Sequence, residues 1–181
     1  MSILWFLCPI IAFGAMVDAI AGGGGLITLT AYVAVGLPPQ TALANNKFSS
    51  SSGTLIATFK YFGKGQISFV VGTIAIIFSF IGSFFGSSLA SLYAATYLNY
   101  LLLFLVPALA VFMLIKPDFG QAKQHSKSVV LTLSALSALI IGAYDGFFGP
   151  GTGMFLTIVF TSVLGLDLLR ACGTARIVNL A

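Results

Sequence analysis

The chain has 181 residues, of which 59% are hydrophobic and 7% are charged, whereas a soluble domain carries roughly 25% charged residues. With a mean hydropathy of +1.08, this composition excludes a water-soluble domain, because a core of this size could not bury so much apolar surface, and it predicts an all-α polytopic membrane protein. Eight Lys and Arg against four Asp indicate which loops face the cytoplasm, and they do not indicate a nucleic-acid partner.

The first predicted helix covers residues 3–21, which are apolar except for Asp18 and are long enough to cross most of a bilayer. The N-terminal residues lack the basic region and cleavage site of a signal peptide, so we expect this helix to be retained. Four glycines follow it, namely Gly22, Gly23, Gly24 and Gly25. Because each glycine costs about 1 kcal/mol in a helix interior, they predict a break. Backbone that leaves the helix inside a membrane must be buried in protein or line a polar cavity. Transporters form substrate sites at such helix breaks, so this break is a candidate anion-binding site.

Residues 26–35 form a short apolar piece that would reach only about 15 Å as a helix, so it is predicted to be a half-helix. The sequence Gly-Leu-Pro-Pro at 36–39 ends this piece and starts the next, because proline fits the first turn of a helix. That next helix is predicted to run from Pro39 to about Phe62. Its first half carries polar residues at Asn45, Asn46, Lys47, Ser49, Ser50, Ser51, Ser52 and Thr54. A polar face does not suit lipid, so we expect it at the centre of the helix bundle.

Two further membrane spans are predicted at residues 67–90 and 97–115. A basic turn with Lys60 and Lys64 precedes them, and a connector at residues 116–127 that holds three Lys follows them. Because two crossings separate the basic turn from the connector, both lie on the same side of the membrane. The positive-inside rule makes that side cytoplasmic.

A second break is predicted at residues 144–153, where the sequence reads YDGFFGPGTG after an apolar span at 128–148. A second short apolar piece follows at residues 154–164. Asp167 is then a candidate N-cap for a last helix. That helix reaches the final residue after only about four turns, so we expect it to be unfinished.

The second break repeats the order of residue types around the first. At one offset between the copies, Asp18, Gly22 and Gly24 align with Asp145, Gly149 and Gly151. When the offset is increased by two residues, Gly36, Leu37 and Lys47 align with Gly165, Leu166 and Arg176. If each short piece counts as a crossing, five crossings separate equivalent points, and an odd number inverts the second copy. The predicted fold is therefore an inverted repeat with Gly-broken half-helices, which is typical of secondary transporters. The predicted domains are a first repeat with its following helices (1–115), a basic cytoplasmic connector (116–127) and an incomplete second repeat (128–181).

Three segments carry a resemblance to a known family. They are residues 14–25 (GAMVDAIAGGGG), residues 36–47 (GLPPQTALANNK) and residues 144–151 (YDGFFGPG). The chain resembles the TauE/SafE, or sulfite exporter, family, in the branch with the paired motif IDSIAGGGG, TNK and GFYDGFFGP. The resemblance implies a multi-pass permease of the bacterial inner membrane that exports sulfite, organosulfonates or related anions. Family members continue for two or three more membrane helices after the second motif, so this chain resembles a C-terminally truncated member.

The candidate substrate site combines backbone amides at half-helix ends with two cations. Helix N-termini bind oxyanions through their N–H groups, and an Arg can hold an oxyanion bidentately where a Lys acts as a point charge. Two Asn add neutral donors. The predicted substrate-binding residues are Gly22, Gly23, Gly24, Gly25, Asn46, Lys47, Gly149, Gly151, Thr152, Arg176 and Asn179.

Asp18 and Asp145 need a separate explanation, because ionised carboxylates beside the site would repel an anion. Burial favours the neutral carboxylic acid, so one of the two is a candidate to carry a coupling proton. The structural alternative is a set of buried ion pairs that join Asp18 to Lys47 and Asp145 to Arg176. The glycines have a structural alternative too, which is close helix packing alone.

Other classes of function have less support in the sequence. The sequence contains no HExxH motif, no GxSxG motif and no Ser/His pair, so we do not expect an enzyme. Cys8 and Cys172 lie far apart and outside any Cys/His cluster, so no metal and no cofactor is expected. The alternatives to a permease are an anion channel and a non-transporting membrane scaffold or accessory subunit. The predicted partners are a small anion, the lipid bilayer and, if another copy completes the missing helices, a homo-oligomer.

Overall fold

The computed structural model describes residues 2–92 and 125–180, with residues 100, 104, 106–108 and 111 between them. Every regular element in the two long segments is an α-helix. Three of them, α1 (Ser2–Ala21), α4 (Phe69–Leu92) and α6 (Lys127–Phe147), are long and apolar enough to cross a membrane. The prediction of an all-α polytopic membrane protein is thereby confirmed. The predicted span at 97–115 and the connector at 116–127 fall largely outside the described residues.

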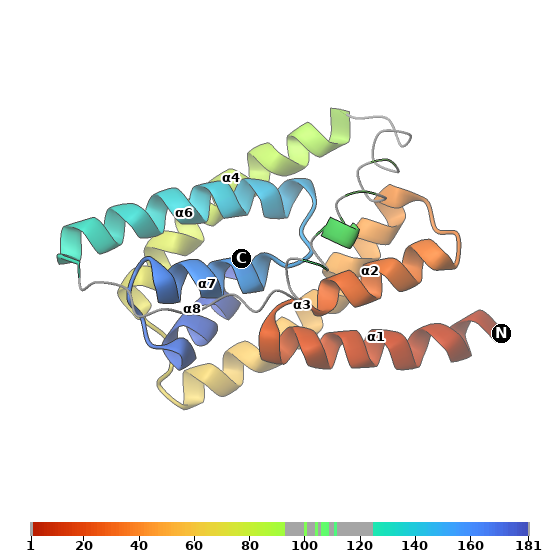
Figure 1. The fold of residues 1–181 in the computed structure, drawn as a ribbon, viewed down its shortest axis with the longest axis horizontal. Helices are drawn as coiled ribbons and strands as arrows, with labels where there is room; N and C mark the ends of the chain where they lie inside the picture. Colours follow the sequence, from red (N-terminus) through yellow and green to blue (C-terminus); the bar gives the residue numbers. More distant parts are fainter. Residues whose placement is uncertain are drawn as a thin grey trace.

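The first half of the chain begins with a helical hairpin, in which α2 (Gly24–Ala34) folds back along α1 (Figure 1). Gly22 and Gly23 separate the two helices. Gly22 has a φ of +83°, a left-handed conformation that glycine adopts without steric cost. Gly24 and Gly25 form the first turn of α2. The predicted break is therefore confirmed, but only half of the four-glycine run leaves the helix.

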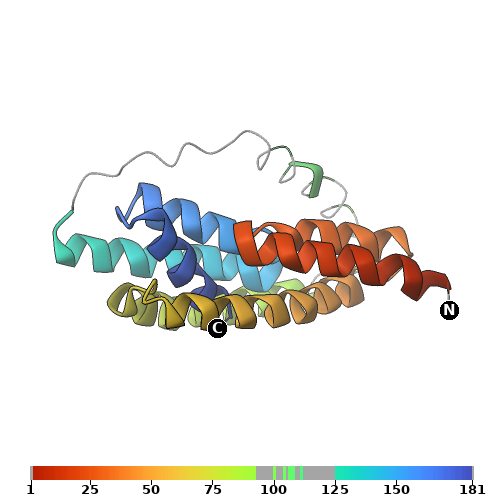
Figure 2. The same cartoon turned by 90° about the horizontal axis from the view of Figure 1, so that it is seen from below.

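Helix α3 (Pro39–Gly63) begins at the predicted proline. It runs along one side of α1 and α2 and also packs against α8 (Leu168–Leu180) in the second half of the chain (Figure 2). Asn46 and Thr54 are buried on its inner side, whereas Ser51 and Ser52 are exposed. The polar face thus points inward as predicted, although it takes up only part of the polar segment.

The second half repeats the hairpin with α6 and α7 (Thr152–Ser162), which are separated by residues 148–151. The two hairpins point in opposite directions and their breaks lie near the middle of the molecule (Figure 1), as an inverted repeat requires. After α7 the chain turns into α8. The Oδ1 of Asp167 accepts a hydrogen bond from the N–H of Arg170 at 3.1 Å, which confirms the predicted N-cap.

Helices α4 and α6 pack closely because glycines line their contact. A Cβ atom at Gly142 would lie 2.7 Å from the Cα of Ser79, and one at Gly86 would lie 2.9 Å from the backbone nitrogen of Phe147. Small residues at helix contacts let backbones approach closely in membranes. This contact joins the first half of the chain to the helix that ends at the second break.

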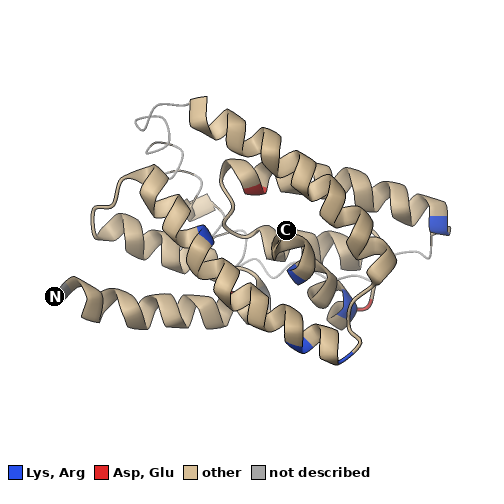
Figure 3. Ribbon diagram, turned by 180° about the vertical axis from the view of Figure 1, so that it is seen from behind, with Lys and Arg blue, Asp and Glu red and all other residues tan. Residues whose placement is uncertain are grey.

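Large apolar side chains cover the outward faces of the helices. Trp5, Phe59, Phe80 and Phe84 are each more than half exposed, which suits contact with lipid. Charged positions are sparse in the described part of the chain, and Figure 3 shows several of them on α3, on α8 and at the end of α6. Asp18, near the end of α1, is buried. Charge therefore gathers at the junction of the two hairpins.

Candidate functional site

The two breaks are in direct contact at the centre of the molecule. A Cβ atom at Gly22 would lie 2.7 Å from both the carbonyl carbon of Gly153 and the backbone nitrogen of Met154. One at Gly25 would lie 3.6 Å from the Cα of Pro150. The backbones of the two halves could not approach so closely if side chains stood at these positions. Close packing is therefore one role of these glycines, whatever else they do.

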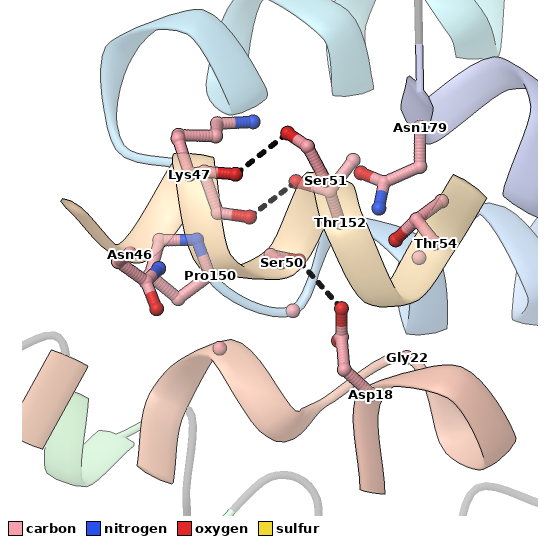
Figure 4. A pocket seen from close by; sticks show the side chains of 14 residues that line it. Asp18, Gly22, Asn46, Lys47, Ser50, Ser51, Thr54, Pro150, Thr152 and Asn179 are labelled. Atoms are coloured by element: carbon pink, nitrogen blue, oxygen red, sulfur yellow. Dashed lines mark hydrogen bonds between the residues drawn. The ribbon is translucent and has the colours of Figure 1, made fainter. Parts of the chain in front are cut away.

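A small cavity lies at this junction (Figure 4). Its volume is about 20 Å³, which is room for about one water molecule. It is lined by Asp18, Gly22, Gly25, Asn46, Lys47, Ser50, Ser51, Thr54, Gly149, Pro150, Gly151, Thr152, Gly153 and Asn179. Most of the predicted substrate-binding residues are thus brought together. Gly23, Gly24 and Arg176 do not line the cavity. Gly24 packs instead against the backbone of Gly14 and Asp18 in α1, and Arg176 lies against Gly22 and Gly153, which do line it.

The N-terminal turns of two half-helices face the cavity. Gly25 belongs to the first turn of α2, and Thr152 and Gly153 belong to the first turn of α7. The N-terminus of a helix carries a partial positive charge from its aligned peptide dipoles. Both hairpins therefore present the end that favours an anion.

Ser50 and Thr54 also line the cavity, although neither was among the predicted site residues. They follow Asn46 on α3 at intervals of four residues, which places all three on one face of the helix. This spacing was the available signal. It did not separate a binding face from a packing face, because Ser and Thr serve both in membrane helices.

Asp145 forms an ion pair with Lys47 and also interacts with Thr152. The Nζ of Lys47 contacts the Oδ2 of Asp145. The hydroxyl of Thr152 lies 2.5 Å from the Oδ1 of the same carboxylate and 2.6 Å from the carbonyl oxygen of Gly149. The predicted pairing of Asp18 with Lys47 and of Asp145 with Arg176 is therefore wrong. The reason is that α3 carries Lys47 across to the break of the other half.

Asp18 has a different environment, although it is the repeat equivalent of Asp145. Its side chain is 3% exposed, and its Oδ2 accepts a hydrogen bond from the hydroxyl of Ser50 at 2.5 Å (Figure 4). No Lys or Arg within the described segments pairs with it. A role in proton coupling stays a prediction for both Asp.

Asn46 joins α3 to the first hairpin from a buried position. The hydroxyl of Thr28 in α2 donates a hydrogen bond to its Oδ1. Its Nδ2 lies on the side of Gly25, where a Cβ atom would be 3.3 Å away. Because Thr28 occupies the carbonyl end of the amide, the NH₂ end of Asn46 is directed at the junction.

Arg176 on α8 is the most unusual group of the site, because its side chain is completely buried and has no partner among the described residues. The residue is 0% exposed, and none of its three guanidinium nitrogens has a hydrogen-bond partner among the residues described. Its Nη1 lies against both breaks, since a Cβ atom would be 3.0 Å from it at Gly22 and 2.7 Å from it at Gly153. The missing side chains of these two glycines make room for the guanidinium group.

Lys47 and Asp145 also line a second, larger hollow. This groove of about 250 Å³ lies between α3, α4 and the end of α6, and includes Gln40, Ser87 and Phe148. Lys47 lines both the groove and the central cavity. The ion pair therefore stands between the cavity and the groove.

Comparison with known proteins agrees with this architecture. The family model described as Sulfite exporter TauE/SafE matches residues 7–181. The chain is 31% identical over 179 residues to the probable membrane transporter protein YfcA of Escherichia coli K12, which covers 99% of this chain and 65% of that protein. It is 33% identical over 165 residues to a probable membrane transporter protein of Haemophilus influenzae, with 91% and 65% covered. No solved structure matches the chain.

A further relative, the probable membrane transporter protein ORF9 of a Sinorhizobium species, is 33% identical over 177 residues, with 98% of this chain and 68% of that protein covered. The chain thus spans about 65% of the length of the first relatives it matches. These relatives are bacterial proteins named as membrane transporters and not as enzymes. Since the family match includes both breaks and nearly the whole chain, the chain belongs to the sulfite exporter TauE/SafE family of multi-pass membrane proteins.

Proposed function

We propose that this protein is a secondary transporter of small oxyanions, such as sulfite or organosulfonates, which bind between the two breaks. The observation that carries the proposal is the guanidinium group of Arg176, which is fully buried and has no partner in the described structure. A buried charge without partners costs several kcal/mol. An oxyanion would supply both the missing charge and the missing hydrogen-bond acceptors. The description of the family as a sulfite exporter supports the same class of ligand.

The groups around Arg176 suit an oxyanion. Its planar guanidinium group can bind two oxygens at once, and the N-termini of α2 and α7 add a favourable dipole. The charge of Lys47 is already balanced by Asp145. Arg176 is thus the cation available to an anion in this form of the protein, and Asn46 and Asn179 are neutral donors nearby.

The size of the cavity supports a transporter over an open channel. A volume of about 20 Å³ is too small for sulfite, so the breaks must separate to admit an anion. A closed site between two inverted hairpins is typical of alternating access. A scaffold would give no reason to bury an unpaired guanidinium group.

Binding of radiolabelled sulfite to the purified chain in detergent tests the role of Arg176. We expect saturable binding that methanesulfonate competes for and that chloride at equal concentration does not. Arg176→Lys keeps the charge but loses the bidentate geometry, so the Kd should rise at least about tenfold, equivalent to ~1.4 kcal/mol. Arg170→Lys is the matched control and should change the Kd by less than about twofold, because Arg170 is exposed and paired with Asp167.

Unchanged sulfite binding in Arg176→Lys, or no saturable binding in the unmodified chain, would contradict the proposal. Flux in proteoliposomes then separates the three classes of function. A transporter shows saturable exchange of labelled sulfite, a channel gives ionic conductance without exchange coupling, and a scaffold gives neither.

A further inference from the structure

The charged residues of the site are related by the internal repeat, but only one of two equivalent ion pairs is formed. Asp18 and Asp145 are equivalent, and so are Lys47 and Arg176. Lys47 of the first half pairs with Asp145 of the second. Exchanging the halves turns this pair into one between Arg176 and Asp18. Within the described segments Arg176 has no partner, and Asp18 contacts Ser50 instead.

The missing pair is within reach of a local rearrangement. The Nη1 of Arg176 lies beside Gly22, whose N–H donates a hydrogen bond to the backbone oxygen of Asp18 at 2.9 Å. The glycine that contacts the guanidinium group is therefore one helical turn from Asp18 along the backbone. Asp18 and Gly22 both line the central cavity. Rotation of the Ser50 hydroxyl would release the carboxylate oxygen that it now occupies.

We propose that the site alternates between two forms that exchange their ion pairs. In the form observed, Lys47 is paired with Asp145 and Arg176 is the unpaired cation. In the second form Arg176 is paired with Asp18 and Lys47 is unpaired. Each form holds one ion pair, one unpaired cation and one carboxylate without a cation (Asp18 in the first form, Asp145 in the second), so its net charge is the same. This inference rests on the proposed function, because the unpaired cation of each form is the group that holds the anion.

The exchange gives the anion a route from one half of the site to the other. Lys47 lines both the central cavity and the groove between α3, α4 and α6, and its partner Asp145 lines the groove. When this pair opens, the two hollows join and Lys47 can take the anion from Arg176. The two hairpins run in opposite directions (Figure 1). The first and second forms therefore open the site toward opposite sides of the membrane.

The reactivity of the Lys47 amine tests the exchange without any ligand. The purified chain is treated with a limiting amount of an amine-reactive acylating reagent, and the modified lysines are quantified by mass spectrometry. Lys60, which is exposed, serves as the internal reference. Asp18→Asn abolishes the second form and keeps Lys47 paired, so its relative rate should fall at least threefold. Asp145→Asn abolishes the first form and should raise the rate at least threefold.

Two further variants keep this test decisive. Asp167→Asn is the matched control and should leave the Lys47 rate unchanged, because Asp167 is exposed and does not line the cavity. Arg176→Gln removes the cation of the pair between Arg176 and Asp18, so it should slow the reaction of Lys47 with the reagent as Asp18→Asn does. The ion-pair exchange would be overturned if Lys47 reacted at an unchanged or faster rate in both Asp18→Asn and Arg176→Gln. It would also be overturned if Lys47 reacted more slowly in Asp145→Asn.

Sulfite measurements separate the failure of this inference from the failure of the proposed function. Asp18→Asn keeps the unpaired Arg176, so we expect saturable sulfite binding to be retained and sulfite exchange to be at least tenfold slower. Wild-type exchange in Asp18→Asn would overturn the ion-pair exchange alone, and so would binding and exchange lost in equal proportion. An unmodified chain that binds no sulfite would overturn the transport function, while the lysine reactivities still decide whether the pairs exchange.

Discussion

The two breaks follow the same sequence plan and yet hold their carboxylates differently. Asp145 at the second break contacts a cation and a hydroxyl, from Lys47 and Thr152. Asp18 at the first break contacts the hydroxyl of Ser50 and has no cation in the described structure. An inverted repeat thus gives two sites of similar backbone shape, but it does not make them electrostatically equal.

The difference arises from the residue at one equivalent position. Thr152 of the second break aligns with Gly25 of the first at the offset that relates the two Asp. The hydroxyl of Thr152 fixes Asp145 within its own hairpin, whereas Gly25 has no side chain with which to fix Asp18. The partner of Asp18 must therefore come from another helix, and α3 supplies Ser50. A carboxylate held from outside its hairpin is the easier one to release when the hairpins move.

The largest effect is expected where the breaks touch. Gly22→Ala meets both a left-handed φ of +83° and the backbone of Gly153 at 2.7 Å. The strain costs roughly 1–2 kcal/mol and the overpacking another 1–3 kcal/mol, so we expect a loss of about 3–4 kcal/mol in the free energy of unfolding. Denaturant titration in detergent micelles, followed by circular dichroism, measures it.

Gly36→Ala is the matched control for that variant. Gly36 has nearly the same φ, +84°, but no atom within 4 Å of the added Cβ. Only the backbone strain remains, so the expected loss is about 1 kcal/mol. Equal losses in the two variants would show that the breaks are not packed against each other.

The next effect concerns the two carboxylates. Asp145→Asn leaves Lys47 without its anion, and the loss of one partner from a buried pair costs about 3–5 kcal/mol. The side chain of Lys47 is 41% exposed, so we expect only about 2 kcal/mol after this discount. Asp18→Asn keeps an acceptor for Ser50 and should cost about 1 kcal/mol or less. Denaturant titration of both variants checks the order, and a larger loss for Asp18→Asn would contradict the assignment of the cation to Asp145.

Much of the fold follows from local signals in the sequence. Glycine runs gave the positions of both breaks, the Pro38-Pro39 pair gave the start of α3, and Asp167 gave the N-cap of α8. Each of these signals acts through the backbone of a few neighbouring residues. The start of α2 at Gly24 was not predicted, because glycine permits both a break and a first helical turn, and tertiary packing decides between them.

The ion pairing at the site could not be read from the sequence. The repeat shows that Lys47 and Arg176 are equivalent, but it does not say which Asp each of them faces. That depends on the path of α3, which contacts α1 and α2 and also reaches α8. Long-range packing therefore brings Lys47 to Asp145, and no local pattern near either residue contains this information.

The smallest effect sharpens the comparison at Asp18. Ser50→Ala removes the hydrogen bond that the carboxylate accepts at 2.5 Å, and its loss should lower the free energy of unfolding by about 1 kcal/mol. Ser51→Ala is the matched control, because the Ser51 hydroxyl is exposed and bonds only to the backbone oxygen of Lys47 in its own helix. It should change stability by less than about 0.5 kcal/mol. If Ser50 holds Asp18 away from Arg176, Ser50→Ala should also favour the pair between those two residues. Lys47 would then react faster in this variant than in Ser51→Ala, and equal rates would show that the hydroxyl does not control the position of Asp18.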